Sequence, residues 1–145
     1  SKNAYSNQNE PIIGGMFHFI YDPKFKSVLP YWDKYPLVIP IEFYSDGFLG
    51  LNLHYLHPLM RAKLLDKLLE YKETSRSKDV YMNVSYNLLK NAIKSSLLQP
   101  CVKRYLTSHV KSKFIKVAPE YWEEVAFLPT QEFQKAGTNV VWGVK

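Results

Sequence analysis

Residues 16–56 constrain the fold of this chain more than any other stretch, because they hold strand patterns separated by turns. Residues 49–56 (LGLNLHYL) place leucine or tyrosine at every second position, with small or polar residues at 50, 52 and 54. This alternation is typical of a strand with one buried face. The Asp46-Gly47 dipeptide predicts a hairpin turn, because these residues readily adopt positive φ. Residues 36–43 (PLVIPIEF) predict the partner strand of that hairpin.

Residues 16–21 predict a further strand, which ends at Asp22-Pro23 because proline cannot donate to a ladder. His18 is expected on the polar face of that strand. The loop that follows, residues 23–36, holds three prolines and five large apolar side chains. A solvated loop rarely carries so many, so we expect it to fold back onto the sheet or to contact a partner.

Helical patterns dominate after residue 57. Apolar residues recur with helical spacing over 58–72, which places Arg61 on the solvent side, and again between Asp79, a capping residue, and Pro100. Two patterns compete over 102–117: the spacing favours a helix to about residue 110, and the β-branched content of the last four residues favours a strand. Pro119 predicts the start of a short helix, and Thr130 predicts a last short turn that ends at Gly137.

These elements predict an α+β fold in a single domain over residues 1–145. A small, strongly bent antiparallel sheet is expected, with a Src-homology-3-like barrel as one form of it, covered by two longer helices and short C-terminal helices. The predicted parts are an N-terminal arm (1–15), a β core (16–56), a mainly helical part (58–136) and a C-terminal tail (137–145). The arm is expected to be ordered only where another part of the chain holds it.

Composition excludes several classes of protein. The single cysteine, Cys101, excludes an intrachain disulfide and a cluster of thiolate ligands, and is expected to be a small buried residue. No apolar run approaches the ~18 residues of a membrane span. The polar start does not resemble a signal peptide, although a chain that begins with Ser1 leaves a missing leader open.

The sequence predicts no enzyme, no metal site and no cofactor. His54 and His57 lie three residues apart without the further ligands that a metal site needs. Asp22 precedes proline and Asp46 precedes glycine, so turn formation explains both. We find no glycine-rich phosphate loop and no nucleophile elbow.

The basic stretch, residues 103–116 (KRYLTSHVKSKFIK), contains no acidic residue within a chain of net charge +6. Its cations and hydroxyls form the mixture that contacts phosphates, which predicts sequence-independent DNA binding. If the first half is helical, Lys103, Arg104 and Lys111 point outwards together. The alternative is a solvated face balanced by the acidic helix that follows. The candidate DNA-binding residues are Lys103, Arg104, His109, Lys111, Lys113 and Lys116.

Three aromatic residues are candidates for partner binding, because Trp and Tyr often dominate interfaces. Tyr31 and Trp32 lie in the proline-rich loop, where stacking on a terminal base pair would supply a preference for DNA ends. Trp142 lies in the apolar segment 139–144, which is expected to add a strand or to dock on another chain. The alternative for Trp32 is a ring buried under its own loop.

Four segments, YDPKFKSVLPYWDKYPLVIPI, DGFLGLNLHYL, CVKRYLTSHVKSKF and WEEVAFLPTQEFQKA, together cover most of residues 16–136. They resemble a family of small proteins from contractile-tailed, T-even-like bacteriophages, the DNA end-protector proteins. LPYWDKYPLV followed by GLNLHYL is the most specific part of this resemblance. The chain is shorter than such proteins, which leaves open a missing N-terminal segment.

The resemblance implies a virion protein that sits on packaged DNA ends near the neck and shields them from host exonuclease on injection. It offers no catalytic residues, and it implies location in the virion and, during assembly, in the host cytoplasm. The second hypothesis is a purely structural neck, tail or baseplate component, which would bind other virion proteins through loop 23–36 and tail 139–144.

Overall fold

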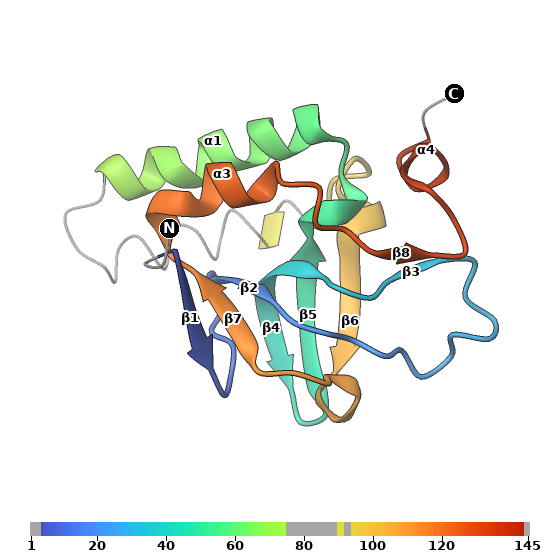
Figure 1. Cartoon of the computed structure of the whole chain (residues 1–145). Coiled ribbons are helices and arrows are strands. Elements are labelled where there is room, and N and C mark those ends of the chain that lie inside the picture. The colour runs from blue at the N-terminus through green and yellow to red at the C-terminus, as the bar shows by residue number, and fades with distance from the viewer. Residues whose placement is uncertain (1–3, 75–89, 92–93, 144–145) are drawn as a thin grey trace.

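The computed structural model of this chain describes residues 4–74, 90–91 and 94–143. A six-stranded antiparallel sheet forms its centre, in the order β1-β7-β2-β4-β5-β6 (Figure 1). The strands of this sheet are β1 (Tyr5–Gln8), β2 (Met16–His18), β4 (Leu37–Tyr44), β5 (Gly47–Asn52), β6 (Val102–Leu106) and β7 (Phe114–Val117). A separate two-stranded sheet pairs β3 (Trp32–Asp33) with β8 (Phe133–Gln134).

Helices lie at one end of the sheet, where α1 and α3 run side by side (Figure 1). The α-helices are α1 (Pro58–Thr74), α3 (Trp122–Ala126) and α4 (Thr138–Val141). Short 3-10 helices lie between these elements: η1 (Leu53–Tyr55), η2 (Gln99–Cys101), η3 (Thr107–His109) and η4 (Pro119–Tyr121). The predicted mixture of helices with an antiparallel sheet is therefore confirmed. The helix predicted from Asp79 falls largely on residues outside the described ranges.

The sheet is open rather than a closed barrel in the part of the chain that the structure describes, with β1 and β6 at its edges. At one edge the N-terminal residues add β1 to β7 (Tyr5 opposite Val117) and extend the sheet away from β6. The arm predicted at 1–15 is thus held in part by β7.

Residues 102–110, predicted as a helix, instead form β6 and η3. The apolar spacing there fits two patterns, and pairing with the free edge of β5 decides between them: Tyr105 lies opposite Phe48 and is buried against it. Residues 114–117 form the predicted strand. Within its described residues, the part predicted as mainly helical, 58–136, therefore contributes three strands, including β8 where Thr130 was expected to cap a turn.

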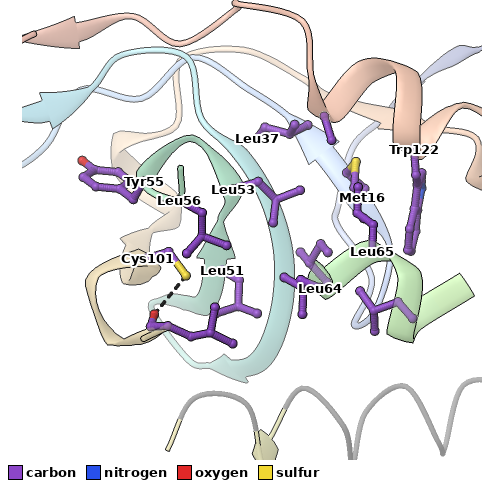
Figure 2. Packing of buried hydrophobic residues seen from close by; sticks show 14 of the residues in the cluster. Met16, Leu37, Leu51, Leu53, Tyr55, Leu56, Leu64, Leu65, Cys101 and Trp122 are labelled. Atoms are coloured by element: carbon purple, nitrogen blue, oxygen red, sulfur yellow. Dashed lines mark hydrogen bonds between the residues drawn. The ribbon is translucent and has the colours of Figure 1, made fainter. Parts of the chain in front are cut away.

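The central strands β2, β4 and β5 are buried on both faces over most of their length, which corrects the expectation of one solvated face. One face carries an aliphatic cluster under α1 and α3, in which Met16, Leu64 and Trp122 lie together (Figure 2). The other face carries an aromatic cluster, whose rings pack mainly edge to face, for example Phe19 on Tyr105 at 5.2 Å between ring centroids. Its members are Phe17, Phe19, Tyr21, Val38, Phe48, Tyr105, Phe114 and the half-buried Val110.

Polar residues on these buried faces are held by specific partners. His18, expected on a polar face, is buried, stacks on Tyr35 at 4.3 Å and bonds through Nδ1 to Pro36 O at 3.0 Å. Arg61, expected in solvent, is buried and donates to the carbonyl oxygens of Leu56 (2.9 Å) and Ala126 (2.8 Å). These bonds tie α1 to α3, and they correct both predictions: a buried polar group persists where hydrogen bonds replace its water.

Candidate nucleic-acid interface

Backbone pairing places the basic stretch directly beside the proline-rich loop. Asp22 N–H donates to His109 O (3.1 Å), and Lys111 N–H donates to Ile20 O (2.8 Å). Tyr21 also forms an isolated antiparallel bridge with Val110. Residues 109–112 therefore run along residues 20–22, immediately before loop 23–36 begins. Two regions that are distant in the sequence become one surface.

The centre of this surface is the basic rim, which we define as His109, Lys111 and Lys113. The two lysines are exposed, and the imidazole Nδ1 of His109 lies 2.8 Å from Asp22 O. The Asp22 carboxylate pairs with Lys26 at 2.8 Å. Its pKa is lowered, first by that hydrogen bond and further by the charges of Lys26, Lys111 and His109. The structure thus brings together three of the six predicted DNA-binding residues.

The other three predicted cations lie elsewhere. Lys103 and Arg104 are consecutive in β6, so their side chains point to opposite faces of the sheet, and the prediction of one helical surface is wrong. Arg104 pairs with Asp46 at the β4–β5 turn, and its guanidinium lies 3.9 Å from the Tyr44 ring centroid. Lys116 lies in β7, between β1 and β2, and is half-buried.

An aromatic cleft of about 150 Å³ opens between loop 23–36 and β6. Tyr31, Trp32 and Tyr55 line it together with Lys103 and the edge of β6. The rings of Tyr31 and Tyr55 lie 6.1 Å apart, and the Lys103 ammonium lies 4.1 Å from the Tyr55 ring centroid. Burial lowers the pKa of Lys103 and raises that of Tyr55. The structure therefore groups Lys103, a predicted DNA-binding cation, with two predicted partner-binding rings.

The Asp33 carboxylate fixes the inner wall of the aromatic cleft. Its Oδ2 accepts hydrogen bonds from His54 Nδ1 (2.6 Å) and Asn52 Nδ2 (3.1 Å). Its Oδ1 accepts from the backbone amides of Tyr35 (3.1 Å) and Glu132 (3.0 Å). Burial alone would raise the pKa of Asp33, but hydrogen bonding and charge interaction with His54 outweigh it, and the pKa is lowered. Trp32 precedes Asp33 in β3, so these bonds also hold the backbone that carries Trp32.

A family model described as the phage T4 terminal DNA protecting protein matches residues 3–143. This chain belongs to that family. The match confirms the resemblance to phage DNA end-protector proteins that the sequence motifs indicate. Searches of curated proteins and of solved structures found no match.

In this member of the DNA-protecting family, the third predicted partner-binding residue, Trp142, lies apart from the aromatic cleft. Its indole N–H donates to His54 O (2.7 Å), and its ring lies 5.3 Å from the Arg61 guanidinium and 5.8 Å from the His57 ring. The tail forms the helix α4 instead of a strand, and it docks on its own chain. Contact of Trp142 with another protein stays a prediction.

Sequence reasoning missed the buried polar network behind the cleft. His54 Nε2 lies 3.1 Å from Thr130 Oγ1, so Thr130, His54 and Asp33 are connected in the order of a hydrolase triad. His54 is fully buried, however, and Thr130 does not line the aromatic cleft, so we interpret the network as structural. The signal that could have revealed it is the placement of Asn52 and His54 among the apolar residues of segment 49–56. The strand predicted there ends at Asn52, and Leu53–Tyr55 form η1 instead.

Among the described residues, no His, Cys, Asp and Glu side chains gather in groups of three or more that could hold a metal ion. The helices in the described ranges also include none that is long and apolar enough to cross a membrane. Cys101 is buried and donates from Sγ to Leu98 O (2.9 Å), as expected for a small core residue (Figure 2).

Proposed function

We propose that this protein binds the ends of packaged phage DNA near the neck of the virion and shields them from exonuclease, without reading sequence and without catalysis. The observation that carries the proposal is the junction of the basic rim with the aromatic cleft, formed by the pairing of residues 20–22 with 109–112. The family supports the end-protecting role. The protein would enter the virion during assembly in the host cytoplasm, and it would need no cofactor.

Lys111 and Lys113 bind phosphates in this proposal, with His109 beside them as a secondary contact. Lys103 and Arg104 contribute from the two faces of β6, and Lys116 contributes least because it is half-buried in mid-sheet. Release of counterions from neutralised phosphates makes such binding strongly dependent on salt. Cations alone carry no base code, so DNA sequence has little effect on affinity.

End preference comes from the aromatic cleft. A continuous duplex offers phosphates to the rim but no exposed base face, whereas a DNA end presents a terminal base that can stack on Tyr31 or Trp32. Both rings are half-buried; Tyr31 packs on Tyr55, and Trp32 lies in β3, which pairs with β8, so both lose less freedom on binding than exposed side chains would. Such preorganisation lowers the entropic cost of binding.

The test compares binding to a linear duplex with binding to a closed circle of equal sequence at several salt concentrations. For Lys111→Ala with Lys113→Ala, we expect weaker binding and a shallower salt dependence, by about two powers of salt concentration. Lys63→Ala with Lys67→Ala removes the same charge from α1, at the other end of the sheet from the β6–β7 turn, and is the matched control (Figure 1). Equal affinity and salt dependence for parent and rim variant would remove the proposal.

A second candidate function is that of a structural component that contacts other virion proteins. The observation that favours it is the tip of loop 23–36, where Phe25 and Val28 are 61% and 76% exposed. The tip is ordered by bonds from Val28 N to Phe25 O (3.0 Å) and from Lys135 Nζ to Leu29 O (2.9 Å). Exposed apolar side chains on an ordered turn are typical of a protein interface. Light scattering of mixtures with purified neck and tail proteins would detect this contact. A protein that stays monomeric in these mixtures would count against the structural function.

A further inference from the structure

The side chain of Lys103 has an unusual environment for a cation. It lines the aromatic cleft, half-buried, and its ammonium contacts the face of the Tyr55 ring. Within the described residues it has no carboxylate partner. Asp33 also lines the cleft, but both of its oxygens accept hydrogen bonds from the fold behind it. A cation held this way favours an anion that enters the cleft.

A backbone amide of β6, that of Arg104, also points towards the aromatic cleft. β6 is an edge strand, and the amides at its two ends point away from β5: Leu106 N–H donates to the Tyr21 hydroxyl (2.8 Å), and Val102 N–H donates to Gln99 O. In an antiparallel ladder the amide direction alternates along the strand, so the amide of Arg104, midway between them, also points to the open edge. Arg104 lines the cleft as well. Its guanidinium is occupied with Asp46 and Tyr44, so its main chain is what it offers there.

We propose that the aromatic cleft binds the terminal nucleotide of a DNA end through its phosphomonoester, which accepts hydrogen bonds from Lys103 Nζ and the Arg104 amide while its base stacks on Tyr31 or Trp32. This inference rests on the proposed function. A cleft of about 150 Å³ is too small for a base pair, so the terminal base enters it unpaired, and an internal phosphate would carry the strand past the cleft on both sides. A terminal phosphate avoids this and carries nearly two negative charges at neutral pH. A closed circle has no such group, which adds a charge-based reason for end preference.

The experiment varies only the chemistry of the end. Three linear duplexes of equal sequence carry a 5′-phosphate, a 3′-phosphate, or hydroxyls at every end, and their affinities for the whole chain are measured by fluorescence anisotropy. We expect one phosphorylated duplex to bind at least about tenfold more tightly than the hydroxyl duplex, as for a charge-assisted hydrogen bond, and that duplex identifies the polarity. Lys103→Met, which keeps the apolar stem over Tyr55, should abolish the difference. Lys67→Met, an equal charge change on α1, should preserve it.

The outcomes separate this inference from the proposed function. Equal binding of the three duplexes, together with preference for linear over circular DNA, would refute the phosphate site and leave end binding intact. If no DNA binds, the proposed function fails, and the cleft is judged by NMR titration with deoxynucleoside 5′- and 3′-monophosphates. A shift of the Arg104 amide with a monophosphate and not with the unphosphorylated nucleoside supports the site, and equal or absent shifts overturn it. The comparison of ends needs no variant, so poor folding of Lys103→Met leaves it decisive.

Discussion

Acidification should destabilise this protein through His18. The imidazole is buried in β2, stacked on Tyr35, with Nδ1 bonded to Pro36 O. The pKa of His18 is lowered from 6.5 to about 4, mainly by burial and also by the charge of His54, whereas the bond to Pro36 O and the charge of Asp33 offset part of this fall. The folded state therefore resists protonation of a group that the unfolded chain protonates readily.

The sign and size follow from proton linkage. Because the pKa is lower in the folded state, the unfolded chain binds more protons below pH 6.5, and stability falls as the pH drops from 6.5 towards 4. A fall of the pKa from 6.5 to about 4 corresponds to about 3 kcal/mol in total, of which about 2 kcal/mol is lost between pH 7 and pH 4.5. The lowered pKa of Asp33 acts only at more acidic pH, where its protonation costs further stability.

Urea denaturation followed by circular dichroism at pH 7, 5.5 and 4.5 measures this loss. His18→Gln retains a polar group that can reach Pro36 O but does not titrate. Its stability at pH 7 should be lower than that of the parent, and its dependence on pH over this range should be smaller by about 2 kcal/mol. If the parent and His18→Gln lose equal stability between pH 7 and 4.5, burial of a neutral His18 is not the cause and the reasoning is refuted.

Three other variants and reagents test the fold. Gly47→Ala should cost at least about 2 kcal/mol in thermal unfolding, because a Cβ there would lie 1.9 Å from Tyr105 O and force β5 and β6 apart; an unchanged melting temperature would contradict this register. Arg61→Met should cost about 3 kcal/mol in urea denaturation, because Leu56 O and Ala126 O lose buried donors, and a loss within experimental error would show that water replaces them. Burial raises the pKa of the Cys101 thiol to about 12, so a disulfide reagent at pH 8 should react at the rate of unfolding; fast modification of the native protein would show that Cys101 is accessible.

Local chemistry was enough to predict the β4–β5 hairpin. Asp46-Gly47 supplies the turn, and the alternation on either side supplies two strands, so each signal lies within a few residues of the structure it predicts. The same holds for α1 after Pro58 and for the short helices after Pro119. These elements depend on backbone preferences that neighbouring residues can satisfy among themselves.

The burial of polar residues could not be predicted in this way. Alternation shows that a strand has two different faces, but only the layers packed on it decide whether the second face meets solvent. Here an aromatic cluster covers that second face, so Asn52 is buried beside Tyr105. His18, on the same face as Met16, and His54, in η1, are buried as well, and all three must find partners inside the protein. Likewise, β6 is a strand because β5 offers it an edge, and that edge is not visible in the spacing of residues 102–106.

The candidate site likewise has features that the sequence determines and features that depend on the tertiary structure. The sequence determined which residues carry charge and which carry rings: an acid-free run over 103–116 and a proline-rich aromatic loop over 23–36. Only the tertiary structure decided that Lys103 and Arg104 part to opposite faces of β6, and that Lys103 faces Tyr31 and Trp32 across one cleft. The physical reason is the sequence separation over which each interaction acts. Composition and turn chemistry act between neighbours, whereas the contact that joins the two regions, from Ile20 N–H to Ser112 Oγ, spans 92 residues and exists only once the sheet has formed.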